Sequence, residues 1–423
     1  MTEKNEFKNR HKSKTSAFTR ERKLPFSMLL SLLLQKSVKS LQLLLNEMVL
    51  KLDMNYTVTN SAYTQARANL NYTAFIELNE KAVVEVAYED MNKVKLYKGM
   101  RVLGIDGSKV MLPNTKDIVD EFGQISYKNN NPEVKGKHAY GLASVMYDVL
   151  NHIVIDSTLS NAKAYEVDLA IKHLSHSNKN DLIVCDRNYP SYYFLSSLIH
   201  NKQKFVIRTS TSSFAQAREL SGGTGAKSQT VLLKAPISAF KDKDKSDLPH
   251  QIKVRFVRVV LPTGENEILI TNLLDEKEFP TKEFLYIYNL RWGVESFYDI
   301  LKNRLELENF TGKTALSVYQ DFYAMIYLSG IETIVTYDTN KELQKKQTKN
   351  PQKVNHAVSF NAIKNQALDI IFSKEDPDII LEKLERLFST NTTQVRKNRK
   401  VPRLTKSDRH RLNWHKRDKK ICY

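Results

Sequence analysis

The stretch Leu182-Ile-Val-Cys-Asp186 is the part of the chain that decides its fold class. Four consecutive apolar residues, with no polar residue between them, are typical of a strand that is buried on both faces of a parallel sheet. A second run of this kind follows at residues 205–207, and helical patterns occupy residues 164–173 and 191–200. This alternation of strands and helices predicts an α/β fold with a mixed sheet.

Further strand patterns precede this stretch. Residues 102–112 predict two short strands around an Asp-Gly turn signal at Asp106, and residues 138–146 and 152–159 predict two more strands. Asp106 and Asp186 each follow an apolar strand, and the ligands of open α/β sheets bind beyond the carboxyl ends of strands. Both aspartates are therefore candidates for chemistry. Each also has a structural alternative, a hairpin turn for Asp106 and a helix cap for Asp186.

The first part of the chain has a different pattern. Helices are predicted at residues 24–50, about 61–69 and about 73–88, which together indicate a small all-helical domain. The short middle helix carries Arg67 and is a candidate for insertion into a DNA groove, as in helix-turn-helix proteins. A plain helical bundle is the alternative.

The rest of the chain changes pattern twice more. Strand patterns broken by polar stretches predict a β-rich insertion, and helical patterns then run to about residue 388. The last 35 residues hold twelve Lys and Arg against two Asp, a net charge of +10, and are either a DNA contact or a solvated end. The predicted domains are residues 1–96, 97–209, 210–281, 282–388 and 389–423.

Composition restricts the class of protein. The 423 residues are 41% hydrophobic and 26% charged, an ordinary mixture for a folded protein of two or three domains. The net charge of +18 favours a polyanionic partner, either nucleic acid or an acidic membrane surface. Two cysteines are too few for a disulfide scaffold and indicate a reducing compartment. Residues 1–23 do not resemble a signal peptide, and the apolar stretch 28–34 is far shorter than the ~20 residues that span a membrane. We therefore expect a soluble intracellular protein that binds nucleic acid and no membrane.

A predicted helix over residues 288–302 carries four polar residues on one face. At ~100° per residue, Tyr288, Arg291, Glu295 and Lys302 fall within an arc of about 60°, and an apolar stripe lies about 120° away. We expect the stripe to pack on the sheet and the polar face to be exposed. The alternative is an ordinary amphipathic helix, in which the Arg291–Glu295 pair contributes only ~0.2–0.5 kcal/mol.

The three carboxylates suggest one kind of chemistry. Asp106, Asp186 and Glu295 come from two strand ends and a helix, so they can converge on divalent cations. Mg²⁺ prefers oxygen ligands, and two such ions ~4 Å apart activate an attacking oxygen and stabilise a leaving oxygen. The neighbouring cationic side chains would hold a DNA backbone. No spacing of cysteines and histidines resembles a zinc site.

These residues also carry a resemblance to a known family. Tyr288-x(2)-Arg291-x(3)-Glu295-x(6)-Lys302 resembles the YREK signature of bacterial insertion-sequence transposases of the IS-four family. Gly104-Ile-Asp-Gly107, Cys185-Asp-Arg-Asn-Tyr-Pro-Ser191 and the opening Phe18-Thr-Arg-Glu-Arg-Lys-Leu-Pro-Phe26 are similar to other motifs of that family. The resemblance covers about residues 15–310.

The resemblance implies a fold and a set of roles. It implies a ribonuclease-H-like core that is interrupted by a β domain, with Asp106, Asp186 and Glu295 as ligands of two Mg²⁺ ions, for which Mn²⁺ is a substitute. Tyr288, Arg291 and Lys302 would then grip the DNA strand and its terminal phosphate.

It also implies an activity and its partners. The expected activity is DNA cleavage and strand transfer through a hairpin end, by a homodimer on paired terminal inverted repeats that acts on target DNA in the bacterial cytoplasm, at the nucleoid. Two alternatives remain, a non-catalytic DNA-binding protein derived from such an element and a metal-dependent nuclease that cleaves without joining.

Overall fold

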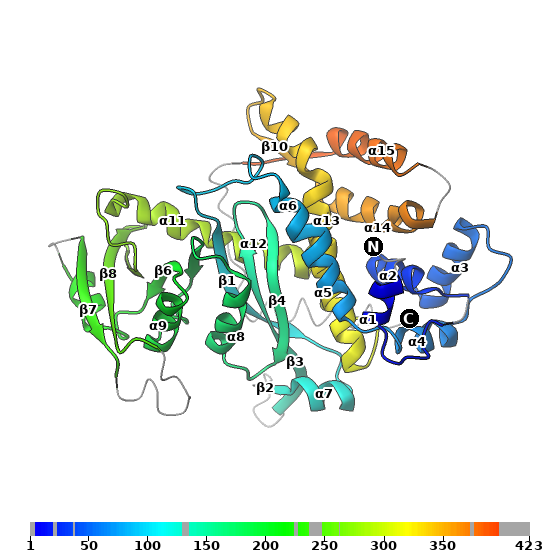
Figure 1. The fold of residues 1–423 in the computed structure, drawn as a ribbon, viewed down its shortest axis with the longest axis horizontal. Coiled ribbons are helices and arrows are strands. Elements are labelled where there is room, and N and C mark those ends of the chain that lie inside the picture. Colours follow the sequence, from blue (N-terminus) through cyan, green and yellow to red (C-terminus); the bar gives the residue numbers. More distant parts are fainter. Residues whose placement is uncertain are drawn as a thin grey trace. The chain divides into compact units, whose positions relative to one another are not determined.

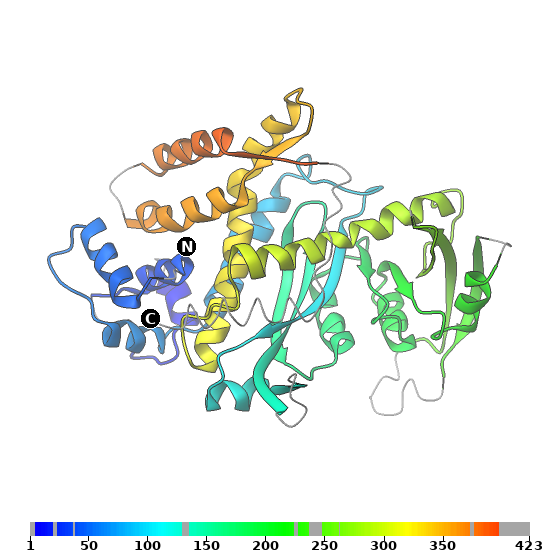
Figure 2. The same cartoon turned by 180° about the vertical axis from the view of Figure 1, so that it is seen from behind.

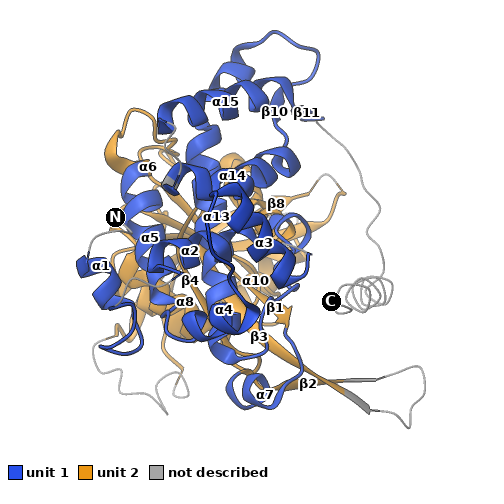
Figure 3. Ribbon diagram, turned by 90° about the vertical axis from the view of Figure 1, so that its right-hand side faces the viewer, with its two compact units in different colours: residues 1–86, 112–121, 300–423 blue, residues 87–111, 122–299 orange. Residues whose placement is uncertain are grey.

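The computed structural model describes residues 5–19, 23–36, 39–128, 135–223, 227–236, 248–261, 263–372 and 376–396. The chain divides into two compact units, which Figure 3 shows in different colours. Unit 1 comprises residues 1–86, 112–121 and 300–423, and unit 2 comprises residues 87–111 and 122–299. Among the described residues, no helix is both long enough and apolar enough to cross a membrane.

Unit 2 is built on a nine-stranded sheet (Figure 1). Strand β5 is parallel to β1 and β6, and the other pairings are antiparallel, so the predicted mixed sheet is confirmed. The strands follow the order β2 (Gln124–Lys128), β3 (Lys135–Asp148), β1 (Val102–Met111), β5 (Leu182–Cys185), β6 (Lys204–Thr209), β9 (Asn266–Thr271), β8 (Gln251–Val260) and β7 (Ser228–Lys234), and β4 (Ile153–Asn161) also pairs with β3.

Strand β1 corrects one prediction from the sequence. The expected turn at Asp106 is wrong, because β1 continues through it and pairs with β3 at nine consecutive positions. A long partner strand outweighs the local turn preference of an Asp-Gly pair, since strand preference depends on neighbours. Gly107 provides space instead: a Cβ at this position would lie 3.0 Å from Cδ of Glu166.

Helices cover both faces of this sheet. α8 (Glu166–His173) and α9 (Tyr192–His200) lie on one face, and α11 (Phe284–Leu290) and α12 (Trp292–Asp299) cross the other, as Figure 1 and Figure 2 show from opposite sides. All four residues of β5 are buried, which agrees with the unbroken apolar run in the sequence.

Residues 210–281 contribute to the same sheet. They supply α10 (Ala215–Ser221) and strands β7, β8 and β9. Strand β9 pairs with β6, from Val206 opposite Thr271 to Thr209 opposite Ile268, so these strands extend the sheet rather than forming one of their own.

Unit 1 is mainly helical, and its longest helix is α13 (Ala315–Lys345). Tyr72 stacks against Tyr319 and Tyr323 of this helix. At Gly330 a Cβ would lie 2.5 Å from Val83, so only glycine permits the close contact with the π-helical turn there. Further helices of the unit include α1 (Asn5–Arg10), α2 (Phe26–Gln35), α3 (Leu41–Lys51), α4 (Asn60–Arg67), α5 (Thr73–Asn79), η1 (Glu80–Val84), η5 (Ile300–Arg304), α14 (His356–Phe372) and α15 (Pro377–Thr390).

The structure differs from the sequence prediction in the N-terminal helices and describes only the start of the basic tail. The single helix expected at residues 24–50 is two helices, because Ser40 begins α3 by accepting a hydrogen bond from the backbone N–H of Leu43 at 3.3 Å. At the other end, α15 is followed by β11 (Thr392–Gln394), which pairs with β10 (Gln352–Val354). Most of the predicted basic tail, residues 397–423, lies outside the described residues.

Candidate active site

Asp106 and Asp186 lie at the same level beside two hydrogen-bonded strands. Strands β1 and β5 are parallel, with Gly104 opposite Val184. Asp106, within β1, and Asp186, which directly follows β5, each stand two residues beyond this pair, and neighbouring strands are ~4.8 Å apart. The pairing register therefore brings the two carboxylates together, and both side chains are half-buried.

Helix α12 brings Glu295 to the same end of β1. Gly104 lets the helix approach closely, because a Cβ at this position would lie 3.4 Å from Cβ of Val294. One turn later, the Tyr298 hydroxyl donates a hydrogen bond to the carbonyl oxygen of Asp106 at 3.0 Å. Glu295 lies between these two contacts on the helix, so the helix axis crosses β1 close to Asp106.

The electrostatics of Asp106 agree with this placement. Burial raises the pKa of Asp106 to about 7, with further contributions from the negative charges of Asp186 and, to a lesser extent, Glu295. The positive charge of Arg291 and a hydrogen bond from the backbone N–H of Gly107 at 2.9 Å lower the pKa of Asp106 in opposition. Two other carboxylates thus act on Asp106 in a partly desolvated place, and a shifted pKa of this kind is typical of functional sites.

Tyr288 and Arg291 are placed differently from the prediction. They are 2% and 4% exposed, so the expected exposed polar face is wrong for these two residues. Arg291 donates from Nη2 to Oε1 of Glu295 at 2.8 Å, and its guanidinium lies 5.4 Å from the ring centroid of Tyr288 and 4.9 Å from that of Trp292. The helical-wheel argument assumed that one side of the segment packs. The segment instead contacts β6 and β8 through α11 and β1 through α12, which encloses the residues at the junction.

These two buried groups are not fully satisfied. The Tyr288 hydroxyl and Nε of Arg291 have no hydrogen-bond partner among the described residues. Buried polar groups are usually paired, so exceptions of this kind call for an explanation, and a catalytic role is one.

Lys302 is not on the same helix as Glu295. It lies half-buried in η5 (Ile300–Arg304), a π-helical turn that follows α12. Because a π turn closes hydrogen bonds between residues i and i+5, the α-helical projection that aligned Lys302 with Glu295 does not apply beyond Asp299.

Arg67 lies inside unit 1. It is 6% exposed and donates hydrogen bonds to Oε1 of Gln320 at 2.7 Å and to Oδ1 of Asp321 at 2.8 Å. It also donates to the Thr311 hydroxyl and the Ser317 carbonyl oxygen. The side chain predicted to contact DNA is thus part of an internal hydrogen-bond network. The periodicity of a short helix does not reveal which of its faces a distant helix such as α13 covers.

The donors of the site suit a divalent cation only in part. Asp106 and Asp186 offer carboxylate oxygens at neighbouring strand positions. Burial is the main cause of the raised pKa of Asp106, and a cation would relieve the repulsion from Asp186 that adds to it. Glu295 is paired with Arg291 instead. In agreement, no three acidic, histidine or cysteine side chains form a metal-binding cluster in the described part of the chain.

Two further residues at this place were missed by the sequence analysis. Glu166, at the start of α8, touches Gly107, and its pKa is raised by burial and then by the negative charge of Asp186. Tyr189 is fully buried, and its hydroxyl has no hydrogen-bond partner in the described residues. Burial raises the pKa of Tyr189, and the charges of Asp106 and Glu166 raise it further, so the phenol stands near both carboxylates. Glu166 has no sequence signal, since it looks like an ordinary acidic residue in the first turn of a helix.

A small hollow lies beside the second aspartate motif. Its volume is about 170 Å³, and it is lined by Arg187, which directly follows Asp186, and by Arg208 and Glu267. Nη2 of Arg208 lies 2.7 Å from Oε1 of Glu267, whereas the side chain of Arg187 is exposed. The exposed guanidinium of Arg187 is therefore the cationic group that directly follows the second aspartate of the site.

The chain is similar to known proteins in sequence and in structure. Residues 97–329 match a family model that is described as the transposase DDE domain. A solved structure of the piggyBac transposase synaptic complex with hairpin DNA is similar, with 11% identity, coverage of 95% of this chain and 82% of that chain, and a TM-score of 0.43. No curated protein sequence matches this chain.

Proposed function

Because the chain belongs to the transposase DDE domain family, we propose that it cuts DNA at the ends of an insertion sequence and joins those ends to target DNA. The observation that carries this proposal is the equal register of Asp106 and Asp186 beside α12. It places two acidic residues from distant parts of the sequence at one end of a parallel strand pair, where ligands of α/β sheets bind.

The finer family assignment rests on sequence. The spacing of Tyr288, Arg291, Glu295 and Lys302 supports membership of the IS-four group with a YREK signature. The contacts of Arg291 with Tyr288 and Glu295 support a joint role for these three residues.

The core is proposed to be ribonuclease-H-like. The central strand order β4-β3-β1-β5-β6 supports this. In this order β3 runs opposite to the other four strands, which all run in the same direction. Within this arrangement the proposed organisation remains a helical DNA-binding region at residues 1–96, core segments at 97–209 and 282–388, an insertion at 210–281 and a basic tail at 389–423.

The proposed roles follow from the placements. Asp106 and Asp186 would hold Mg²⁺, or Mn²⁺ as a substitute, and Glu295 would join them when Arg291 turns to a DNA phosphate. Bound metal would supply Lewis-acid stabilisation of charge on phosphate oxygens. Glu166 would help to orient the aspartates from the opposite side of β1, since it touches Gly107.

The partners are proposed from the same resemblance. The substrates would be duplex DNA carrying the terminal inverted repeats of the element, and target DNA. Two copies of the chain would act on paired ends, through a hairpin end that Tyr288, Arg291 and Lys302 grip. The place of action would be the bacterial cytoplasm, at the nucleoid.

Cleavage of element-end DNA tests the proposal. The genomic flanks of the reading frame supply the DNA, which is end-labelled and incubated with the protein and Mg²⁺, then resolved on denaturing gels that separate nicked, hairpin and joined products. We expect metal-dependent cutting that Asp106→Asn abolishes while DNA binding persists. Asp120→Asn is the matched control, because Asp120 is an exposed aspartate of α7 (Lys116–Phe122).

The outcomes separate the alternatives. Binding without cleavage by the wild-type protein would indicate a non-catalytic DNA-binding protein. Cleavage without transfer to a second duplex would indicate a nuclease. Cutting by Asp106→Asn at the wild-type rate would remove Asp106 from the site.

A further inference from the structure

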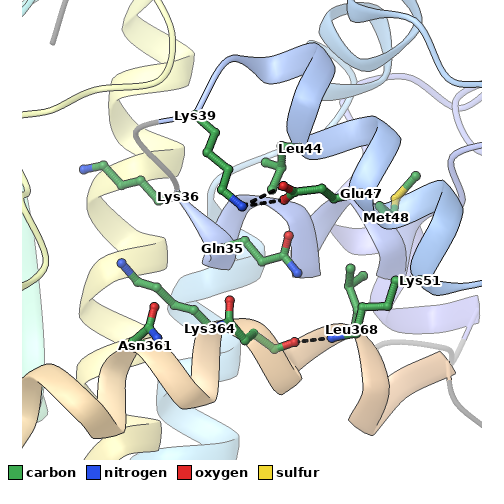
Figure 4. A pocket seen from close by; sticks show the side chains of 11 residues that line it. Gln35, Lys36, Lys39, Leu44, Glu47, Met48, Lys51, Asn361, Lys364 and Leu368 are labelled. Carbon is green, nitrogen blue, oxygen red and sulfur yellow. Dashed lines mark hydrogen bonds and ion pairs between the residues drawn. The ribbon is translucent and has the colours of Figure 1, made fainter.

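Unit 1 contains a cavity that neither the carboxylate site nor the transposase DDE domain match accounts for. It has a volume of about 440 Å³ and lies between α2, α3 and α14 (Figure 4). Of its eleven lining residues, four are lysines and one is acidic. The lysines are Lys36, Lys39, Lys51 and Lys364, and we call this cavity the lysine pocket.

Two of the four lysines are neutralised by acidic neighbours. Nζ of Lys39 lies 2.7 Å from Oε1 of Glu47, and Nζ of Lys51 lies 2.6 Å from Oδ2 of Asp369. The first pair joins Lys39, just before α3, to Glu47 of α3, as Figure 4 shows, and the second joins Lys51 of α3 to Asp369 of α14. Their positive charges are therefore already compensated.

The other two lysines have no ion pair in the described part of the chain. Lys36 is 7% exposed, and its Nζ donates to the carbonyl oxygens of Glu306 and Leu307, at 3.0 Å each. Lys364 is half-buried on α14. Figure 4 shows the side chains of Lys36 and Lys364 extending toward the same side of the pocket, with Asn361 beside Lys364.

Burial dominates the electrostatics of both ammonium groups, and the nearest acidic residues compensate it only in part. Burial lowers the pKa of Lys36 to about 8; the charge of Asp321 opposes this, that of Lys364 lowers the pKa further, and that of Glu306 raises it. Burial also lowers the pKa of Lys364, and the charge of Glu306 opposes this effect. Burying a charge without a partner is costly, and an anion between two ammonium groups would remove that cost. The neighbouring amide groups of Gln35 and Asn361 offer additional hydrogen-bond donors.

From this arrangement we propose that the lysine pocket binds a backbone phosphate of DNA. The proposal rests on the proposed function, because DNA that is held for cleavage presents its backbone phosphates to the protein surface at high local concentration. A phosphate offers several acceptor oxygens to ammonium and amide donors. Lysine and amide side chains are among the groups that commonly contact phosphate oxygens of a DNA backbone. The pocket would stabilise the complex with DNA without reading the base sequence.

The salt dependence of DNA binding tests this assignment. The affinity of the full-length chain for a labelled duplex of random sequence is measured by fluorescence anisotropy at several salt concentrations, in EDTA so that no cleavage occurs. Loss of one phosphate contact should reduce the slope of log affinity against log salt by about 0.9. We expect that reduction for Lys364→Gln, an unchanged slope for Lys364→Arg, and an unchanged slope for Lys341→Ala, an exposed lysine of α13.

The outcomes decide between sources of the phosphate. A wild-type slope for Lys364→Gln overturns the DNA assignment. If inorganic phosphate raises the melting temperature of the wild type but not of Lys364→Gln, and the DNA slope is unchanged, the pocket takes a free phosphate ligand instead. Lys364→Gln removes an unpaired, half-buried charge, so a wild-type or higher melting temperature is expected and shows that the variant is folded. The binding assay contains no metal and measures no cleavage. A failure of the cleavage experiment would therefore not change the interpretation of the salt slopes.

Discussion

Substitution of Arg67 by alanine separates an internal role from a DNA contact. The guanidinium group makes four hydrogen bonds, to Gln320, Thr311, Ser317 and Asp321, all within unit 1. The side chain of Asp321 is 0% exposed, and Nη2 of Arg67 lies 2.8 Å from its Oδ1. Arg67→Ala therefore leaves a fully buried carboxylate that still accepts hydrogen bonds from the backbone N–H and the hydroxyl of Thr311 but loses its counter-charge.

The size of the effect follows from this burial. Removing one partner of a buried ion pair typically costs ~3–5 kcal/mol, because the remaining charge is uncompensated. For a unit of this size, each kcal/mol lowers the melting temperature by about 2–4 °C, so Arg67→Ala should melt about 6–20 °C below the wild type. Arg10→Ala is the matched control. Arg10 is 52% exposed in its pair with Glu77, and exposed pairs contribute only ~0–1 kcal/mol.

Calorimetry and DNA binding are measured on the same preparations. We expect Arg67→Ala to melt early while its affinity for duplex DNA, measured well below the melting transition, stays at the wild-type value. A wild-type melting temperature combined with weakened DNA binding would refute the reasoning. It would place Arg67 at a DNA interface, as the helix-turn-helix interpretation of the sequence predicted.

Three further predictions concern other residues. Glu166→Gln should weaken Mn²⁺ binding by about 10-fold in isothermal titration calorimetry, a loss typical of residues that orient metal ligands. An unchanged affinity would show that Glu166 has no such role. Arg291→Ala should destabilise unit 2 by ~1–3 kcal/mol in urea unfolding, because it removes a hydrogen bond from a buried guanidinium to Glu295, whose side chain is 39% exposed. A wild-type free energy of unfolding would mean that Arg291 does not stabilise the junction of α11 and α12. For Lys36, whose pKa is lowered to about 8 from 10.5, the unfolded chain binds more protons between these values. Stability of unit 1 should therefore rise as pH increases from 8 to 10, and urea midpoints of Lys36→Met should lack this rise.

The sequence by itself predicted the strands and helices that carry the candidate carboxylates, because their patterns of apolar residues are local. Apolar runs that end in an aspartate predicted β5, and strand and helix alternation predicted α8, α9 and β6. Alternating or apolar runs also predicted β7, β8 and β9. These features are local, because burial on both faces leaves a direct mark on the order of residues. The spacing from Tyr288 to Lys302 is likewise readable without a structure.

The tertiary structure decided which of these residues meet and which are covered. Pairing with β3 held β1 straight through Asp106, where the local signal favoured a turn. Packing of α11 and α12 enclosed Arg291, and packing against α13 enclosed Arg67. Glu166 joined the carboxylates only because a glycine on β1 allows close approach. The physical reason is the same in each case: long-range contacts set the burial of a polar side chain, and neighbours along the chain carry no record of them.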